Sequence, residues 1–297
     1  MKKDRFLAGC ICFALLSLLL IPAAAGAGEA QVRSVPAADM LKGEKGEGES
    51  FHILLIGQDE RPGEPGKRSD SLILCSFLPG KKRMILTSFL RDLYVKIPGY
   101  GYERLNAAYA IGGKELLDRT LEENFGIHID GNMEVDFEQF SRIIDDLGGV
   151  SLELREDEAR EISRLTEPIG EGLQHLNGDQ ALVYARIRKL DADSDFSRTL
   201  RQRKLLTAVT EQYRNLNFAS FLKLSKTILP AVTTDMSGFE ILTYGKWILP
   251  MLQEMEIESL QIPQEGMARD ETIRGMQVLM PDLPTIIENL KTVLNPQ

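Results

Sequence analysis

The chain has 297 residues, of which 43% are apolar and 27% are charged, and its formal net charge is -9. This composition is typical of a folded globular protein and excludes a disordered or fibrous one. The negative charge argues against nucleic-acid binding, because the chain as a whole would repel a phosphate backbone. Three histidines and three cysteines without metal-ligand spacing exclude a structural zinc site.

The N-terminal segment predicts export. Three basic residues among the first five are followed by an uncharged apolar run over residues 6–21 and then by a run of small residues. The apolar run is short for a complete membrane span, and small residues at alternate positions suit cleavage by signal peptidase. We therefore interpret residues 1–25 as a signal peptide, with an uncleaved membrane anchor as the alternative. Either way, the protein is expected at the extracellular face of the cytoplasmic membrane or in the cell wall.

Residues 26–50 separate this segment from the part of the chain that is expected to fold. They are rich in Gly, Ala, Glu and Lys and show no apolar periodicity, which is typical of a flexible linker. No comparable break follows, so residues 51–297 are predicted to form a single domain.

Three apolar runs open this domain. Phe51–Gly57 is continuous and ends at a glycine, as expected for a strand that is buried on both faces. Leu72–Leu78 and Met84–Phe89 are separated by a turn containing Pro79 and Gly80, which predicts a hairpin. Cys75 lies inside the second run and is interpreted as a buried apolar side chain, not as a nucleophile.

Helices and strands then alternate without a repeat. Apolar residues recur at helical spacing after Asp136, which together with Gln139 resembles a capping box, and Gly148 and Gly149 end this helix. Val150–Leu154 alternates like a half-exposed strand. Further helices are predicted near residues 200–213, 218–229, 238–254 and 284–294, with a strand over 257–262. The mixed pattern predicts an α/β or α+β sandwich with a central sheet.

Arginines occur beside turns or element ends in a chain that is otherwise acidic. Arg198, Arg201 and Gln202 stand at positions i, i+3 and i+4, so they share one helix face, where two guanidinium groups and an amide can bind an anion. Asp195 is a candidate cap for this helix and would leave its first N–H groups free for the same anion. Each feature alone is more often a solvated face, a turn or an ion pair. The residues themselves therefore predict only a candidate phosphate-binding α/β protein.

Taken in order, several sequence blocks between residues 51 and 215 resemble the LytR-CpsA-Psr family. Ordered blocks are far more specific than any single motif. The blocks are Gly57-x-Asp59-x-Arg61, Arg68-Ser69-Asp70-Ser71, Phe89-Leu90-Arg91-Asp92, Arg104–Gly113, Asp145–Val150, Gly172–Arg188 and Asp195–Gln202.

This resemblance implies a fold and an activity. The fold would be an α/β (α-β-α) sandwich, in which a central mixed β-sheet is flanked by helices and an apolar channel binds lipid. The protein would be a transferase of cell-wall biogenesis, specifically a phosphotransferase. It would move a phospho-glycopolymer, such as teichoic acid, from a polyprenyl-pyrophosphate carrier to a peptidoglycan sugar hydroxyl. Its partners would be the carrier-linked glycopolymer, peptidoglycan and the membrane surface.

The resemblance also assigns site residues. The pyrophosphate would be bound by Arg68, Arg91, Arg186, Arg188, Arg198, Arg201 and Gln202. Asp59 and Asp70 would coordinate Mg²⁺ or Mn²⁺, and Asp59 is also a candidate general base. Catalysis would depend on these two carboxylates and on Arg68, Arg91 and Arg201. Such a set suits phosphoryl transfer, which is promoted mainly by positioning and by neutralising charge on the phosphate oxygens.

Two positions depart from the family pattern. Leu90 stands where a proline usually precedes the arginine that matches Arg91, which would leave the local backbone less constrained. Gln58 stands where a small residue usually precedes Asp59, and its side chain would narrow the metal site or add a ligand. Neither change removes a charged group that the mechanism uses.

Two other functions remain open on the sequence. One is a pyrophosphatase that releases polyprenyl phosphate, with water in place of the sugar hydroxyl. The other is a non-catalytic lipid- or glycopolymer-binding module with a regulatory role. The intact acidic pair and the complete set of arginines argue against a degenerate site.

Overall fold

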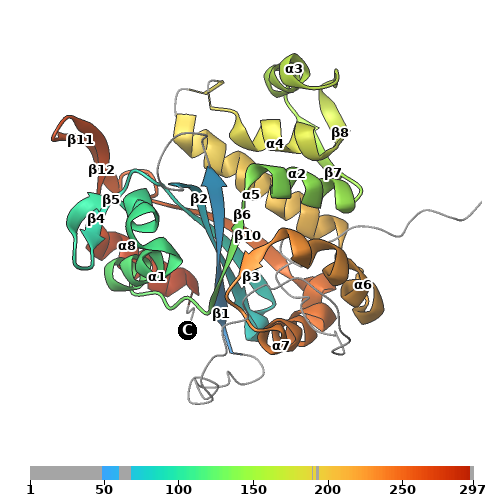
Figure 1. Cartoon of the computed structure of the whole chain (residues 1–297), viewed down its shortest axis with the longest axis horizontal. Helices are drawn as coiled ribbons and strands as arrows, with labels where there is room; N and C mark the ends of the chain where they lie inside the picture. The colour runs from blue at the N-terminus through green and yellow to red at the C-terminus, as the bar shows by residue number, and fades with distance from the viewer. Residues whose placement is uncertain (1–48, 60–67, 189, 192–193, 295–297) are drawn as a thin grey trace, which may run out of the picture.

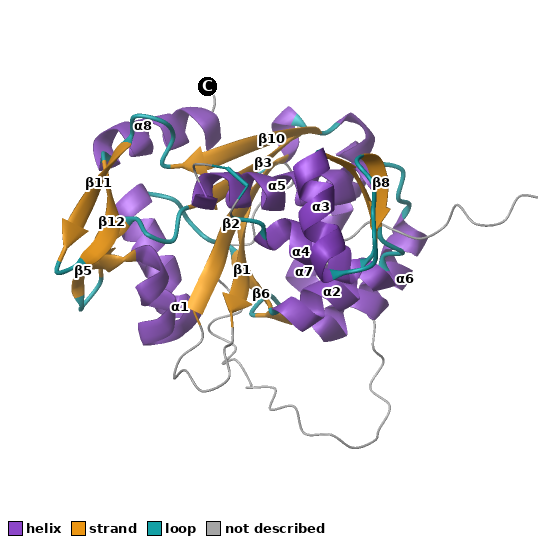
Figure 2. Cartoon of the chain, turned by 90° about the horizontal axis from the view of Figure 1, so that it is seen from above, coloured by secondary structure: helices purple, strands orange, loops and turns teal. Residues whose placement is uncertain are grey.

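The computed structural model describes residues 49–59, 68–188, 190–191 and 194–294 of the chain. A six-stranded sheet runs through its centre, with helices on both faces (Figures 1 and 2). The predicted signal peptide, and the predicted linker up to residue 48, lie outside the described residues. Within the described residues, no helix is both long enough and apolar enough to cross a membrane.

The central sheet is mixed, as the resemblance implied. In spatial order its strands are β10 (Glu256–Ile262), β3 (Arg83–Phe89), β2 (Arg68–Leu78), β1 (Phe51–Asp59), β6 (Gly131–Val135) and β9 (Thr233–Thr234). β2 is antiparallel to both β1 and β3, which confirms the predicted hairpin. β1 is parallel to β6 and β3 is parallel to β10, whereas β9 closes the sheet antiparallel to β6.

Helices cover both faces of the sheet and complete the α-β-α sandwich (Figures 1 and 2). The face called here the cavity face is covered by α2 (Phe137–Asp146), α4 (Gly178–Arg186), α5 (Ser194–Gln212), α6 (Phe218–Ile228) and α7 (Gly238–Ile248), with α3 (Glu156–Leu165) packed on α4. The opposite face is covered by α1 (Leu105–Phe125), which is kinked at Gly112 and Gly113, and by α8 (Leu283–Leu294).

Three antiparallel pairs of strands lie beside the central sheet in the described part of the chain. The pairs are β4 (Tyr94–Ile97) with β5 (Gly101–Arg104), β7 (Val150–Leu154) with β8 (Gly172–Leu176), and β11 (Ala268–Ile273) with β12 (Met276–Pro281). β7 alternates between buried and exposed residues, as its sequence predicted.

The inner strands are apolar on both sides because each face of the sheet has its own core. Ile53 packs in the core of the cavity face, whereas its neighbour Leu54 packs in the core under α1 and α8. Both side chains are fully buried, and so is the side chain of Cys75. Two buried faces account for the uninterrupted apolar runs that distinguish these strands in the sequence.

The boundaries of the helices follow local signals. The predicted capping box of α2 is present, because the Gln139 N–H donates to Asp136 Oδ1 (2.8 Å) and the Asp136 N–H donates to Gln139 Oε1 (2.9 Å). The helix predicted over 238–254 is shorter than expected: α7 ends at Ile248, and a 3-10 turn over Leu249–Glu254 follows. Pro250 explains this difference, since proline lacks the N–H that would continue the α-helix.

On the cavity face, α2 and α4 pack so closely that their contact requires a glycine. A Cβ atom at Gly178 would lie 2.0 Å from the carbonyl oxygen of Ser141. The Gly178 N–H also donates to Asp145 Oδ1 (2.7 Å), which ties the start of α4 to the end of α2. Two of the family-like sequence blocks, Asp145–Val150 and Gly172–Arg188, are therefore joined through this helix contact.

We expect Gly178→Ala to destabilise the protein by about 1–3 kcal/mol, because the added methyl group must push α2 and α4 apart. Urea denaturation monitored by circular dichroism measures the change in unfolding free energy. Gly170→Ala is the matched control, since a Cβ atom there meets its nearest neighbour, a side-chain nitrogen, at 3.5 Å. Equal losses in the two variants would contradict the packing argument.

Candidate functional site

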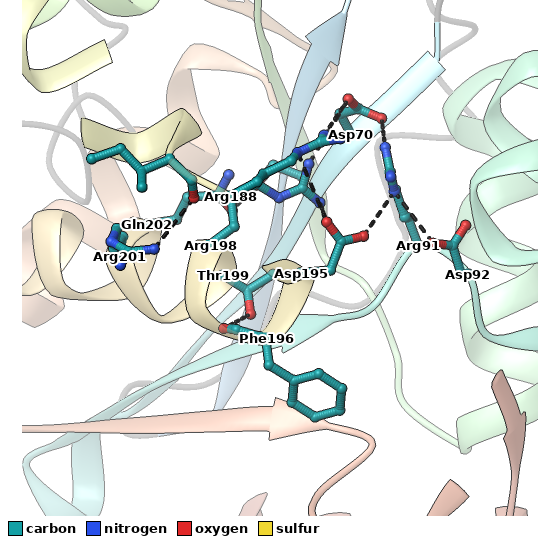
Figure 3. A network of polar contacts seen from close by, with 12 residues as sticks. Asp70, Arg91, Asp92, Arg188, Asp195, Phe196, Arg198, Thr199, Arg201 and Gln202 are labelled. Atoms are coloured by element: carbon teal, nitrogen blue, oxygen red, sulfur yellow. Dashed lines mark hydrogen bonds and ion pairs between the residues drawn. The ribbon is translucent and has the colours of Figure 1, made fainter. Parts of the chain in front are cut away.

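Charged side chains from four separate segments meet beside the bulged start of β2 (Figure 3). Asp70 belongs to β2, and Arg91 follows β3. Arg188 follows α4, whereas Asp195 and Arg198 belong to the first two turns of α5. The sheet and two helices thus bring together residues that are far apart in the sequence.

A bulge in the pairing of β1 with β2 directs Asp70 into this group. Gly57 pairs with Ser71 and Gln58 pairs with Ser69, so Asp70 is an extra residue in β2. In a regular strand the side chains of Asp70 and Ser71 would point to opposite faces. Here both side chains line the same cavity, which is the effect expected of a bulge that re-aims a side chain beside a functional site.

Two carboxylates bridge three arginines. Asp70 lies 2.8 Å from Arg91 Nη1, 3.1 Å from Arg188 Nη2 and 3.9 Å from Arg198 Nη1. Asp195 lies 3.1 Å from Arg91 Nε, 3.8 Å from Arg188 Nε and 3.6 Å from Arg198 Nη2. Each carboxylate therefore contacts all three guanidinium groups, and we call these five residues the arginine cluster.

Burial and neighbouring charges shift the pKa values of Asp70 and Arg198 in the arginine cluster. Burial raises the pKa of the Asp70 carboxyl, but the charge and hydrogen bond of Arg91, with Arg198 and Arg188, outweigh burial and lower that pKa below its usual value. Burial lowers the pKa of Arg198 to about 10, so this guanidinium remains protonated at neutral pH. Its Nε is buried without a hydrogen-bond partner among the described residues. The cluster therefore retains donor capacity for an anion.

The arginine cluster borders a polar cavity, and this cavity adjoins an apolar one. The polar cavity, of about 670 Å³, is lined by Gly57, Asp70, Ser71, Phe137, Arg186, Arg188, Arg198 and Gln202. The apolar cavity, of about 880 Å³, shares Gly57, Ser71, Phe137, Arg186 and Gln202 with the first. It continues between the sheet and α2, α4 and α5, along Leu55, Met133, Val135, Phe140, Leu182, Leu205 and Leu206.

Four of the residues assigned by resemblance belong to the arginine cluster, and two more line the polar cavity. Gln202 accepts a hydrogen bond from Ser71 Oγ (2.9 Å), and Arg186 lies over the ring of Phe137 (4.1 Å to the centroid). Asp59 and Arg68 face each other in the pairing of β1 with β2, but their side chains lie outside what the structure describes.

The sequence predicted that Arg201 shares an anion-binding face with Arg198, but the structure places Arg201 outside the arginine cluster. It is 3% exposed, does not line the polar cavity, and lies apart from Asp70 in Figure 3. Its Nε donates to Glu158 Oε1 (2.8 Å), its Nη1 donates to the Ile187 carbonyl (3.3 Å), and its Nη2 pairs with Asp191. Glu158 and Asp191 thus both bind the Arg201 guanidinium. The hydrogen bond to the Ile187 carbonyl fixes the segment that carries Arg188.

Asp195 also differs from its predicted role. α5 begins at Ser194, so Asp195 lies inside the first turn and is not the cap. Its carboxylate faces the arginines, which makes it a site residue that the sequence analysis missed. Its place three residues before Arg198, on the same helix face, is the signal that points to this contact.

The two departures from the family pattern have structural explanations. The Leu90 N–H donates to the Ile262 carbonyl (2.8 Å), a bond that proline could not make, and the Asn106 N–H donates to the Arg91 carbonyl (3.1 Å). Hydrogen bonds thus constrain the backbone at Arg91, contrary to expectation. The Gln58 amide donates to Tyr109 Oη and to Glu134 Oε2 (2.6 Å each), so it is turned toward α1.

Comparison with known proteins identifies sequence relatives. The sequence profile of the LytR_cpsA_psr family matches residues 25–294. The regulatory protein MsrR of Staphylococcus aureus is 33% identical over 223 residues, which cover 73% of this chain and 66% of MsrR. The polyisoprenyl-teichoic acid–peptidoglycan teichoic acid transferase TagU of Bacillus mycoides is 34% identical over 220 residues, which cover 73% of this chain and 70% of TagU.

Solved structures of TagT share the fold. TagT bound to LIIa-WTA has a TM-score of 0.69 and 29% identity, over 84% of this chain and 93% of TagT. TagT with bound octaprenyl pyrophosphate lipid has a TM-score of 0.65 and 25% identity, over the same shares of the two chains.

We expect Asp195→Asn to destabilise the protein by about 1–3 kcal/mol, because one of the two carboxylates that bridge three buried or half-buried guanidinium groups is then lost. Inorganic pyrophosphate should restore part of this loss by replacing the missing negative charge. Urea denaturation with and without pyrophosphate measures both effects. Glu156→Gln, which breaks an exposed pair with Arg160, is the control and should cost less than about 1 kcal/mol. Unchanged stability of Asp195→Asn would contradict the bridging role.

Proposed function

Because the chain belongs to the LytR_cpsA_psr family, we propose that it is a phosphotransferase of cell-wall assembly. It moves a phospho-glycopolymer from a polyprenyl-pyrophosphate carrier to a sugar hydroxyl of peptidoglycan. The observation that carries this proposal is that the arginine cluster borders a polar cavity, which in turn adjoins an apolar cavity. A cationic group joined to an apolar cavity matches an amphiphile with a charged pyrophosphate and a hydrocarbon tail.

The two cavities divide the carrier between them. The guanidinium groups of Arg91, Arg188 and Arg198 bind the pyrophosphate oxygens, which take the place of the two carboxylates as partners. The polyprenyl chain lies along the apolar side chains between the sheet and α2, α4 and α5. Arg186, which is exposed at the boundary shared by the two cavities, adds positive charge there.

The transfer exchanges a phosphoanhydride for a phosphodiester. The acceptor hydroxyl oxygen forms a bond to the phosphorus that bears the glycopolymer. The bond from this phosphorus to the bridging oxygen breaks, and polyprenyl phosphate leaves with the electron pair. The arginines stabilise the charge that develops on the phosphate oxygens, and the hydroxyl proton passes to a base, for which Asp59 is the candidate.

A divalent cation, Mg²⁺ or Mn²⁺, fits the carboxylates of this site. Asp70 is held ionised, and oxygen ligands from one or two carboxylates and from substrate phosphates are the usual set for Mg²⁺. The described residues contain no cluster of three metal-ligating side chains, so the phosphates would complete the set around Asp70 and Asp59. The cation would neutralise phosphate charge.

The N-terminal segment supports export of this activity. An apolar run of the length found over residues 6–21, preceded by basic residues, would deliver the domain to the outer face of the cytoplasmic membrane or to the cell wall. The lipid carrier and the peptidoglycan acceptor would meet there, at the membrane surface.

We expect Arg198→Met to lower kcat/KM for transfer about 10²–10³-fold, because a buried donor to the phosphates is removed. The assay incubates the protein with a polyprenyl-pyrophosphate-linked polymer and a peptidoglycan oligomer, and mass spectrometry detects the covalent adduct. Arg203→Met is the matched control, since Arg203 is also buried on α5 but contacts Ser259 and Gln261 instead of the cavity. Hydrolysis without an adduct would identify a pyrophosphatase, and binding without turnover would identify a non-catalytic module.

We expect chelation of divalent cations to abolish transfer and added Mg²⁺ or Mn²⁺ to restore it. Asp70→Asn should raise the cation concentration that gives half-maximal rate, because one ionised ligand is lost. The rate is measured against cation concentration for the native protein, for Asp70→Asn and for Glu156→Gln as the control. Identical cation curves for the native protein and Asp70→Asn would remove Asp70 from the metal site.

A further inference from the structure

The hairpin formed by β4 and β5 presents tyrosine rings to solvent, outside both cavities. Tyr100 is 63% exposed and Tyr102 is 59% exposed. The ring of Tyr102 stacks on that of half-buried Tyr94, with 6.0 Å between centroids and 27° between planes. Exposed aromatic rings gathered on one hairpin are unusual on a protein surface and point to a binding role.

This hairpin is anchored to α1. The side chain of Asn124 on α1 substitutes for a neighbouring strand: its Nδ2 donates to the Lys96 carbonyl (2.8 Å) and its Oδ1 accepts from the Lys96 N–H (3.2 Å). Val95 and Ile97 are fully buried beneath the hairpin. Figure 1 shows β4 and β5 beside α1 and next to β12. A fixed support lowers the entropy cost of binding to the exposed rings.

The hairpin is tied to the arginine cluster through its base. Asp92 Oδ2 lies 3.5 Å from Arg91 Nε, and Asp92 Oδ1 accepts from Arg104 Nη1 (3.1 Å). Arg104 is the cross-strand partner of Tyr94. A continuous strip of side chains therefore runs from Arg91 through Asp92 and Arg104 to the tyrosines.

This strip and the apolar cavity lie on opposite sides of the arginine cluster. The apolar cavity extends under α2, α4 and α5, whereas the hairpin packs with α1, in the core of the opposite face. If the polyprenyl chain binds on the cavity face, the second substrate can approach Arg91 from the side of the hairpin. This second substrate must bring a hydroxyl oxygen to the phosphorus held by the arginines.

We propose that Tyr94, Tyr100 and Tyr102 form a stacking surface for the acceptor, the glycan strand of peptidoglycan. A pyranose ring has an apolar face of C–H groups, which packs on an aromatic ring, and a rim of hydroxyls that form hydrogen bonds. Asp92 and Arg104, whose side chains are 27% and 32% exposed, provide polar partners for that rim. The inference rests on the proposed function and names the site where its acceptor binds.

The test measures binding of a soluble peptidoglycan glycan, four sugars long, by isothermal titration calorimetry without any lipid donor. We expect the double variant Tyr100→Ala/Tyr102→Ala to weaken binding about tenfold or more. The double variant Tyr100→Phe/Tyr102→Phe keeps the rings and should bind nearly as the native protein does. Phe239→Ala is the control, because Phe239 is also 63% exposed but lies on α7. In the transfer assay, Tyr100→Ala/Tyr102→Ala should raise KM for the acceptor and leave KM for the lipid donor unchanged.

The outcomes separate this inference from the proposed function. Glycan binding that depends on the rings, in a protein that transfers nothing, supports the stacking surface and overturns the transferase. Transfer with unchanged glycan affinity in the alanine variant overturns the stacking surface alone. Absence of glycan binding by the native protein also overturns it, and so does a ring-dependent binding to phosphatidylglycerol vesicles without glycan binding, which would identify a membrane contact.

Discussion

The candidate site depends on two carboxylates that bridge three arginines. Without Asp70 and Asp195, the guanidinium groups of Arg91, Arg188 and Arg198 would repel one another in buried or half-buried positions. The carboxylates allow this positive charge to gather before any phosphate binds. Because the bridges are ion pairs between separate elements, a phosphate can replace a carboxylate as partner without a change of fold. The carboxylates thus stabilise the folded site while leaving the arginines able to bind a polyanion.

The sheet explains why the cluster forms at this place. β2, the segment after β3 and the segment after α4 each deliver one charged residue to the same region, and α5 supplies the remaining two. The bulge at Asp70 turns its carboxylate toward the cavity face, where a regular strand would have pointed it away from Ser71. Arg201, buried against Glu158 and Asp191, holds the segment of Arg188 in place. Arg201 therefore positions Arg188 without lining the polar cavity itself.

The two faces of the sheet divide the proposed substrates. The cavity face has an apolar space for a lipid chain between the sheet and α2, α4 and α5. The opposite face is filled by the core under α1 and α8, and its hairpin presents tyrosines to solvent. The arginine cluster lies between these regions, where a phosphate can be reached from both. This geometry suits a reaction in which a lipid leaves on one side and a sugar enters on the other.

The sequence by itself determined four of the six strands of the central sheet, β1, β2, β3 and β10, and the family of the chain. Apolar runs such as Phe51–Gly57 show burial on both faces, and the Asp136 capping box shows where a helix starts, because both signals act over a few residues. The ordered sequence blocks, several of which contain arginines, indicated phosphate chemistry through their resemblance to the family.

Only the tertiary structure distinguished the roles of residues that look alike in the sequence. Arg198 and Arg201 share α5, yet one joins the arginine cluster and the other pairs with Glu158. Helical spacing shows which residues share a face, but it does not show which carboxylates from distant segments reach that face. The bulge at Asp70 and the hydrogen bond of Leu90 to Ile262 likewise depend on neighbouring strands that no local pattern specifies.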